Sequence, residues 1–513
     1  MSAPRFFAPT LDPGDDIVEL PRDEAEHLSR VLRLGVGDEV AVFNGHGVEF
    51  RARVVAADRR DARVQLVSRI EAAQESPVRV TLVQAVLKGD KMDGHDFVAS
   101  ALKAGAGIAV VSRSTDDMRA AGPLLVVKDD PLRGLEAMGR AARARSAAKI
   151  VAVTGSVGKT STKEMLRVAL SASGETHASA ASFNNHWGVP LTLARLHPSS
   201  AFGVFEIGMN HSGEITPLVG MVKPHVAVVT TVAASHLGHF KSLDEIAAAK
   251  AEIFSGVVPG GAAVINRDSP YFEFLKTQAK REGITRIHGF GKHEDADIRL
   301  IGLALHGHCC CITASLFGEK VTYKLGMPGE HMALNSLAVM AVAKLAGADV
   351  ARAALALSEA KPAKGRGVQE TLRVPGGTLQ LIDESYNANP ASMAAALALL
   401  PHNGKSGRRI AILGDMLELG TFGPDLHRAI AKDLTANKVD LLFAAGPLMA
   451  ELWSAVPAAM RGAHAATSAE LKEAVLGALQ AGDRVVVKGS LGSKMGLIAE
   501  AIKAKWPPVE SEK

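Results

Sequence analysis

Cysteine is scarce in this chain of 513 residues: only three are present, and they are contiguous at positions 309–311. Because neighbouring residues of a strand point to opposite faces, these thiols do not converge on one metal ion, and we interpret them as buried or edge residues in a reducing compartment. An apolar run of membrane-spanning length is lacking, as is the apolar segment of a signal peptide near the N-terminus. These absences lead us to expect a cytoplasmic protein.

A large excess of charge of one sign is lacking too. The net charge of +4 is too small for this length to indicate nucleic acid or a membrane surface by itself. The hydrophobic fraction of 47% and the charged fraction of 22% are typical of a globular protein and exclude a disordered one. The length predicts about three or four domains.

The stretch from residue 151 to 165, VAVTGSVGKTSTKEM, has the pattern of an apolar strand, a tight turn and a helix. Gly155 and Gly158 let backbone N–H groups approach phosphate oxygens, and the helix N-terminus adds partial positive charge. Lys159 supplies a full charge, and Thr160 offers a hydroxyl to Mg²⁺. The full phosphate-loop pattern needs another glycine five residues before Gly158, so an ordinary strand-to-helix turn is the alternative. We predict a nucleoside triphosphate site.

Apolar strand-like runs alternate with helical stretches from residue 150 onward. This alternation predicts parallel sheets with helices on both faces. Glycine-rich breaks near 364–367 and 375–377 indicate a boundary between a central and a C-terminal domain. The predicted strands after the first lie at 204–207, 226–230, 262–265, 379–382, 410–413, 441–445 and 485–487.

Two side chains that directly follow predicted strands are candidate Mg²⁺ ligands, because open α/β sheets place their sites there. Glu206 follows the strand after the phosphate loop, and His236 follows the next. Lys250 lies in the helical pattern DEIAAAKAEIF. The alternatives are a surface acid, a loop histidine and a solvated helix lysine.

From about residue 87 to the C-terminus, the sequence resembles the family of MurF ligases, which join D-alanyl-D-alanine to UDP-N-acetylmuramoyl-tripeptide. The first half of that family's UDP-binding domain is absent, the loop AASHLGHF lacks an expected acid and proline, and KGSLGSK lacks an arginine. A folylpolyglutamate-type ligase, the alternative, gives no reason for NNHWGVPLTL and DESYNANP. The motifs that carry the resemblance are TGSVGKTSTKEM, SFNNHWGVPLTLARL, EIGMNHSGEI, AKAEIF, GEHMALNSLA, KGRG, IDESYNANPAS, GDMLELG and VKGS.

The resemblance implies a set of site residues. The implied ATP contacts are Thr154, Gly155, Ser156, Val157, Gly158, Lys159, Thr160, Ser161, Asn335, Arg366 and Asp383, with His331 more weakly. The implied Mg²⁺ ligands are Thr160, Glu206, His236 and a Lys250 that CO₂ has carbamylated. The implied substrate contacts are Asn184, Asn185, Tyr386, Asn387, Lys488 and Ser490. The implied catalytic residues are Lys159, Lys250, His236 and Arg366.

The N-terminal segment resembles a different family. Residues 6–43 and 77–93 are similar to the PUA-like domain of RsmE-type methyltransferases, which modify a uridine of ribosomal RNA. The words LKGDKMD at 87–93 fit both families, which indicates the seam of a fusion; the alternative is one unusual N-terminal domain. No methyl-donor motif follows, so RNA binding through arginines such as those at 30, 33, 59 and 60 is the second functional hypothesis.

The resulting expectation is an α/β protein in which a central P-loop domain and a Rossmann-like C-terminal domain follow a small β-rich PUA-like module and a truncated ligase domain. The expected boundaries are 1–80, 81–146, 147–366 and 367–513. We expect small-molecule substrates, ATP and Mg²⁺, and a monomer without membrane insertion.

Overall fold

The computed structural model describes residues 4–26, 28, 34–44, 48–57, 62–70, 93–128, 130–179, 181–235, 237–400 and 407–509. The chain divides into two compact units, Met1–Gly134 and Leu135–Lys513, each of which is described by itself. The predicted four-part division stays a prediction, and the predicted seam at 87–93 lies outside the described residues except for its last residue, Asp93. No helix within the described ranges is both long and apolar enough to cross a membrane.

The first unit contains a five-stranded sheet in the order β1-β3-β4-β5-β2. Alternate residues of its strands, including Val42, Val54 and Val64, are fully buried, as expected for the β-rich module. A second, two-stranded parallel sheet, β6-β7, packs with two short helices. The elements are β1 (Arg5–Phe7), β2 (Ile17–Glu19), α1 (Arg22–Glu26), β3 (Glu39–Phe43), β4 (Glu49–Ala57), β5 (Ala62–Ile70), η2 (Gly94–Phe97), α2 (Val98–Lys103), β6 (Ala109–Val111), α3 (Asp116–Ala121) and β7 (Leu124–Val126).

The central part of the second unit is built on a nine-stranded sheet in the order β16-β15-β14-β13-β12-β11-β8-β10-β9. The strands are β8 (Lys149–Thr154), β9 (Thr176–Ala178), β10 (Phe202–Glu206), β11 (Val226–Val229), β12 (Ala262–Asn266), β13 (Arg286–Gly291), β14 (Ile298–Leu305), β15 (Cys310–Leu316) and β16 (Glu319–Leu325). The strands predicted at 204–207, 226–230 and 262–265 are therefore confirmed. Strands β14 to β16 pair antiparallel and were not predicted.

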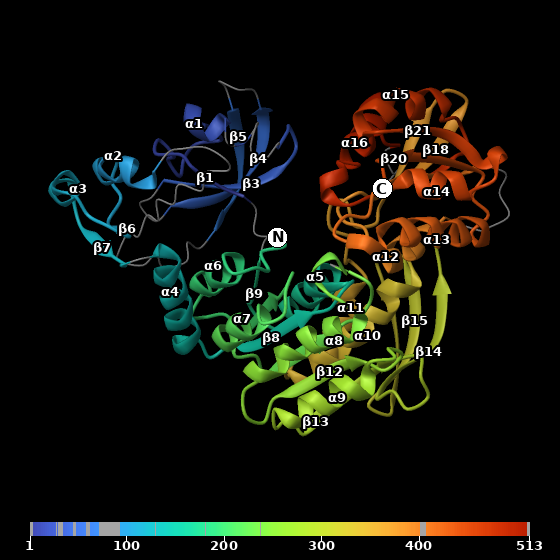
Figure 1. Ribbon diagram of the computed structural model, residues 1–513. Coiled ribbons are helices and arrows are strands. Elements are labelled where there is room, and N and C mark those ends of the chain that lie inside the picture. Colours follow the sequence, from blue (N-terminus) through green and yellow to red (C-terminus); the bar gives the residue numbers. More distant parts are fainter. Residues whose placement is uncertain are drawn as a thin grey trace. The chain divides into compact units, whose positions relative to one another are not determined.

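Helices cover both faces of this sheet, as the alternation predicted (Figure 1). Val151 and Val153 of β8 join one apolar core with α5 and α10, while Ile150 and Ala152 join the other. The helices are α4 (Pro131–Arg145), α5 (Lys159–Ser171), α6 (Gly188–Ala194), α7 (Ile215–Val222), η3 (Leu237–His239), α8 (Leu243–Ala251), η4 (Glu252–Gly256), α9 (Phe272–Arg281), α10 (Glu330–Leu345) and α11 (Val350–Leu357).

The C-terminal part has a six-stranded sheet in the order β17-β18-β22-β19-β20-β21, parallel except for the edge strand β17. The four strands predicted here are confirmed as β18, β19, β20 and β22. The elements are β17 (Val368–Val374), β18 (Gly377–Glu384), α12 (Pro390–Leu397), β19 (Arg409–Gly414), η5 (Gly420–Phe422), α13 (Gly423–Ala436), β20 (Leu441–Ala445), α14 (Met449–Ala455), η6 (Ala458–Met460), β21 (Arg461–Ala465), α15 (Ser468–Ala478), β22 (Arg484–Lys488), η7 (Leu491–Ser493) and α16 (Gly496–Lys505).

Cys309 directly precedes β15, and Cys310 and Cys311 are its first two residues. Cys310 is buried and Cys311 is exposed, in line with the expected alternation of faces. Burial raises the pKa of the Cys310 thiol to about 11, so this sulfur stays protonated and unreactive at neutral pH.

Candidate functional site

The phosphate loop joins β8 to α5 and is clamped onto the loop that follows β11. Gly155 passes so close to this loop that a Cβ on it would lie 1.9 Å from Thr230 Oγ1. The Thr230 hydroxyl donates to Val157 O at 2.6 Å, and the Ser156 hydroxyl donates to Ala233 O at 2.8 Å. Helix α5 begins at Lys159 directly after the loop, so its free N–H groups face the turn, the arrangement that binds phosphate.

The Lys159 ammonium folds back over this loop and donates to Gly155 O at 2.6 Å. Burial lowers the pKa of Lys159, the negative charge of Glu206 raises it, and the positive charge of Arg366 lowers it. The ammonium therefore lies within electrostatic reach of the charges expected to share its site. A triphosphate entering the loop would replace a backbone carbonyl as the partner of this cation.

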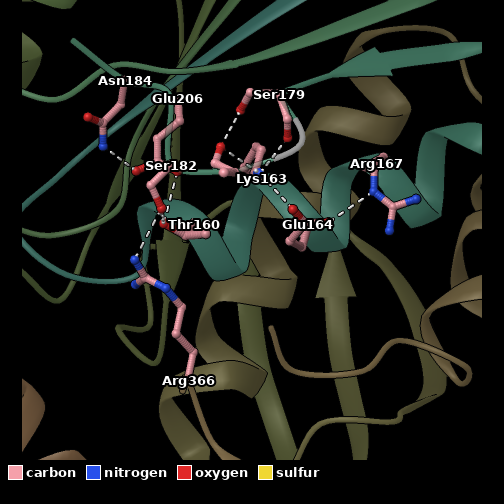
Figure 2. A network of polar contacts seen from close by, with 10 residues as sticks. Thr160, Lys163, Glu164, Arg167, Ser179, Ser182, Asn184, Glu206 and Arg366 are labelled. Carbon is pink, nitrogen blue, oxygen red and sulfur yellow. Dashed lines mark hydrogen bonds and ion pairs between the residues drawn. The ribbon is translucent and has the colours of Figure 1, made fainter. Parts of the chain in front are cut away.

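Glu206 ends β10 next to the phosphate loop, because β10 pairs with β8. Its carboxylate is buried and accepts hydrogen bonds from Thr160 Oγ1 at 2.9 Å and from Asn184 Nδ2 at 2.7 Å (Figure 2). A hydroxyl and a carboxylate 2.9 Å apart are hard oxygen ligands of the kind Mg²⁺ takes beside phosphate oxygens. These residues fit Mg²⁺. Within the described residues, no group of three or more His, Cys, Asp or Glu could hold a metal by itself.

Lys250, on α8, is an almost completely buried lysine. Burial and the nearby positive charge of Lys159 lower its pKa well below the usual value of 10.5. The structure gives its ammonium no hydrogen bond or ion pair with another described residue. It is not part of the cavity lining described next. His236 lies outside the described residues, so its predicted place beside Lys250 stays a prediction.

Residues from the C-terminal part and its junction complete the cleft. Arg366 Nη2 donates to Ser182 Oγ at 3.3 Å, and its guanidinium lies 4.3 Å from the centre of the Tyr386 ring. Lys488 Nζ donates to Glu384 Oε2 at 3.1 Å and to the carbonyl oxygen of Asn387 at 2.9 Å. Two cations and a carboxylate from this side therefore face the phosphate loop across one cavity.

This cavity has a volume of about 430 Å³. Asn335 of α10 lies at its phosphate loop, where a Cβ on Gly158 would come within 2.7 Å of Asn335 Nδ2. His331, on the same helix, also lines the cavity, and burial lowers its pKa, so the ring is neutral at pH 7. The predicted residues that line the cavity are Ser156, Val157, Gly158, Lys159, Thr160, Ser161, Asn184, Glu206, His331, Asn335, Arg366, Tyr386, Asn387 and Lys488.

Other predicted residues lie close to the cleft without lining it. Asp383 is buried, and its carboxylate accepts from Ser385 Oγ at 2.6 Å and Lys503 Nζ at 3.3 Å. Asn185 Oδ1 accepts from the N–H of Gly188 at the start of α6, and Ser490 Oγ accepts from the N–H of Leu417. Thr154 ends β8, and Gly155 is the first residue of the phosphate loop; neither lines the cavity. The ligand contacts predicted for these five residues stay predictions.

The sequence argument missed Ser182 and Glu384, which both line the cavity. Ser182 stands two residues before the motif asparagine at 184, and Glu384 follows Asp383 directly. The available signal was that each of these two polar residues lies next to or near a predicted site residue in the sequence.

Segments of the chain match three known domain families. Residues 153–343 match the Mur ligase middle domain, 370–491 match the Mur ligase glutamate ligase domain, and 20–67 match the RNA methyltransferase PUA domain. The fold class expected from the sequence is confirmed.

Two proteins named UDP-N-acetylmuramoyl-tripeptide–D-alanyl-D-alanine ligase are among the relatives. The chain is 36% identical to that of Escherichia coli K12 over 70% of this chain and 77% of the relative. It is 33% identical to that of Synechocystis over 82% of this chain and 89% of the relative.

Solved structures of MurF ligases are similar to this chain. MurF from Acinetobacter baumannii superimposes with a TM-score of 0.73 at 28% identity, over 86% of this chain and 95% of that one. The MurF ligase of Thermotoga maritima in complex with ADP shares the fold, with a TM-score of 0.70 at 24% identity over 83% of this chain and 94% of that one. Since a relative at 36% identity is covered over 77% of its length, the chain belongs to the family of MurF ligases.

Proposed function

We propose that this chain joins D-alanyl-D-alanine to UDP-N-acetylmuramoyl-tripeptide at the expense of ATP, the reaction of the family to which it belongs. The observation that carries the proposal is the meeting, in one cavity, of the phosphate-loop residues Lys159 and Thr160, the carboxylate of Glu206 and the guanidinium of Arg366. These are the groups that a carboxylate attacking a phosphate requires, because both reactants are anions.

The chemistry has two steps. The tripeptide carboxylate attacks the γ-phosphorus of ATP, the bond to the β-phosphate oxygen breaks, and ADP leaves an acyl phosphate behind. The amine of the dipeptide then attacks the acyl carbon, phosphate leaves, and the amine loses its proton to solvent. Mg²⁺ supplies charge neutralisation between the phosphates and the attacking carboxylate.

Residues of this chain position the reactants for both steps. The N–H groups at the start of α5 and the Lys159 ammonium bind the phosphates, and Arg366 meets the γ-phosphate with a planar cation. Thr160 and Glu206 would hold Mg²⁺. Asn184, Tyr386, Asn387 and Lys488 face the substrates from the two sides of the cavity, which closes when the C-terminal part moves onto the central part.

Lys250 is proposed to act as a carbamate. CO₂ reacts with a neutral amine, and the lowered pKa of this buried lysine favours the neutral form. The product carries a negative charge and two oxygens, which would serve as a second holder of Mg²⁺ with His236. Carbon-13 NMR of the full chain in labelled bicarbonate should show a carbamate resonance that is missing from Lys250→Ala. A resonance that persists in this variant would overturn the assignment.

The test of the ligase function is formation of the joined product. The full chain, ATP, Mg²⁺ and both substrates are incubated, and the UDP-linked product is identified by mass spectrometry. We expect one ADP for each product molecule and no product from Lys159→Ala. Failure of the wild type to form product, or equal product from this variant, would contradict the proposal.

The match of residues 20–67 to the RNA methyltransferase PUA domain favours a second candidate function, RNA binding by the first unit. Four arginines on which the hypothesis drew, at 30, 33, 59 and 60, lie outside the described residues. The test is retention of a ribosomal RNA fragment by the full chain, with a labelled methyl donor present. We expect binding without methyl transfer; absence of binding rejects this candidate.

A further inference from the structure

Lys163 is a buried cation that the mechanism above does not use. It is the fifth residue of α5, and its side chain is fully buried. Its ammonium donates to Ser179 O at 2.8 Å and to Ala181 O at 3.4 Å, and it lies 2.6 Å from a carboxylate oxygen of Glu164. A lysine is almost never buried completely unless it is paired, so the site was built around this ammonium.

Glu164 neutralises this cation on the side away from the cavity. Burial acts to raise the pKa of Glu164, but the hydrogen bonds and charges of Lys163 and Arg167 outweigh it and hold that pKa below its usual value. Arg167 donates to the other oxygen of Glu164 at 2.9 Å. The carboxylate therefore stays ionised, and Lys163 remains free to direct its other N–H groups at carbonyl oxygens.

Those carbonyl oxygens belong to the loop 179–187, which connects β9 to α6. Of the described residues in this loop, Ser182 and Asn184 reach the cavity. Ser182 Oγ lies 3.3 Å from Thr160 Oγ1 and accepts from Arg366, while Asn184 donates to Glu206. Figure 2 shows the two ends of this arrangement: Lys163 under Ser179, and Ser182, Asn184 and Glu206 beside Thr160.

Helix α5 thus contacts the loop 179–187 at two places, through Lys163 and through Thr160. Thr160 and Lys163 stand three residues apart on α5, so they lie on neighbouring positions of its surface. A shift of the loop relative to α5 would change the distance from Asn184 to Glu206, and from Ser182 to Arg366, together. Misplacement by about 1 Å is enough to cost an enzyme roughly 10²-fold in rate.

We propose that Lys163 is a positioning residue that fixes the loop 179–187 against the P-loop helix, so that Asn184 orients Glu206 for Mg²⁺ and Ser182 receives Arg366. This inference rests on the proposed function of the same site. It predicts that loss of the ammonium impairs the use of Mg²⁺ and tripeptide more than the binding of nucleotide by the phosphate loop.

The experiment compares the full-length wild type with Lys163→Met, which keeps the length of the side chain and removes its donors. Arg167→Gln is the matched control, because it removes a partly exposed charge from the same cluster and leaves the bonds of Lys163 to Glu164 and to the loop. The first readout is binding of a fluorescent ATP analogue, without Mg²⁺ and through a Mg²⁺ titration. The second is the KM for UDP-tripeptide and for ATP.

For Lys163→Met we expect nucleotide affinity without Mg²⁺ within about twofold of wild type, and a Mg²⁺ requirement and tripeptide KM each raised by about tenfold or more. Arg167→Gln should stay within about threefold of wild type in all readouts, because its ion pair with Glu164 is partly exposed. Lys163→Gln, which keeps a shorter uncharged donor, should shift in the same direction by less. It replaces the methionine variant if that one does not fold.

The proposal is overturned if the Mg²⁺ titration and tripeptide KM of Lys163→Met and Lys163→Gln match wild type. It is equally overturned if nucleotide binding without Mg²⁺ falls in parallel, since that result indicates a general folding role. Should the wild type itself release no phosphate with both substrates, the proposed function fails. The Mg²⁺ titration of nucleotide binding still decides the role of Lys163.

Discussion

Glu206 illustrates how single side chains prepare the cleft for a metal ion. Two neutral donors, from Thr160 and Asn184, each take one of its carboxylate oxygens. These bonds fix the orientation of a buried carboxylate without neutralising it, and a metal ion arriving with ATP adds the compensating charge. In the proposed mechanism, Asn184 therefore orients Glu206 in addition to any contact with substrate.

Replacing Glu206 with glutamine tests this arrangement. The Glu206→Gln side chain keeps the volume and one acceptor but loses the negative charge. Because a metal ion contributes several kcal/mol to the transition state, we expect kcat to fall by about 10²-fold or more and the Mg²⁺ requirement to rise. Steady-state kinetics against Mg²⁺ measures both.

The control is Glu214→Gln, an exposed acid in the loop that follows β10. Its kinetics should match wild type. If Glu206→Gln behaves like this control, Glu206 is not a metal ligand.

Lys250 is expected to cost stability in return for function. Its folded pKa is lowered well below 10.5 by burial and by Lys159. Below the folded pKa the interior holds a cation without a partner among the described residues, and between the folded pKa and 10.5 folding must remove a proton that the unfolded chain retains. Stability therefore rises with pH through that window, and the cost is largest below it.

Lys250→Met should abolish ligation and raise the free energy of unfolding at neutral pH, measured in buffer free of bicarbonate. We expect a gain of roughly 1–4 kcal/mol, as when apolar side chains replace buried charged groups. The gain should shrink as the pH approaches 10.5. Lys241→Met, at an exposed lysine before the same helix, should change neither property, and an unstable but active Lys250→Met would contradict this account.

At the scale of elements, the turn between β8 and α5 requires glycine at position 158 both for its backbone conformation and for its close approach to helix α10. Gly158 has a φ of 86°, which L side chains adopt rarely, and a Cβ there would lie 2.7 Å from Asn335 Nδ2. Gly213 offers a matched control, since it has a φ of 87° with nothing within 4 Å of its Cβ position. Comparing substitutions at Gly158 and Gly213 therefore separates the effect of backbone strain from the effect of the contact with α10.

Both Gly158→Ala and Gly213→Ala should lose roughly 1 kcal/mol of stability to backbone strain. Only Gly158→Ala should also weaken ATP binding, by about tenfold or more, because the added methyl group displaces the loop from α10. Isothermal titration with ATP and thermal unfolding separate the two effects. Equal ATP affinity in both variants would show that the close approach of Asn335 is without consequence.

The positions of the strands were largely predictable from the sequence. Which of their side chains point into the cavity was not. Seven apolar runs after the phosphate loop became strands because each is buried on both faces between helices. In β18, however, Asp383 and Glu384 are adjacent acids that point to opposite faces, and only Glu384 reaches the cavity. The family resemblance implicated Asp383, whose nucleotide contact stays a prediction, and a single sequence does not show on which side of β18 the phosphate loop lies.

The antiparallel edge of the large sheet was missed for a related reason. None of the strands β14 to β16 is a continuous buried apolar run: β15 alternates buried with more exposed residues, and most residues of β14 and β16 are exposed or half-buried, as expected for an edge with one solvated face. Their glycine-containing connections resemble ordinary loops. Ser182 was missed because its position depends on the buried Lys163, which a single sequence presents as one more helix lysine.

At the scale of the whole molecule, the central and C-terminal parts of the second unit meet through their backbones as well as through the cavity. The N–H of Gly238 donates to Glu418 O at 2.8 Å. A Cβ on Gly420 would lie 2.8 Å from Gly238 Cα. The GDMLELG motif, which includes these residues of the C-terminal part, therefore contacts the loop just after the predicted ligand His236.

Gly420→Ala should prevent this contact from closing. We expect kcat to fall by about tenfold, with ATP binding to the central part within about twofold of wild type, because only the closed arrangement completes the site. Gly376→Ala is the control: it also has a positive φ, 84°, and its nearest neighbour is 3.9 Å away. Stopped-flow and steady-state kinetics of both variants check the prediction, which fails if they behave alike.

The central claim is that a phosphate loop and a metal-binding carboxylate from neighbouring strands act together on two substrates in one cleft. Phosphate release by the full chain, with ATP and Mg²⁺ present, tests it most directly. We predict release only when UDP-N-acetylmuramoyl-tripeptide and D-alanyl-D-alanine are both added, and a fall of about 10²-fold or more in Lys159→Ala. Release that ignores either substrate, or that survives in Lys159→Ala, would contradict the account.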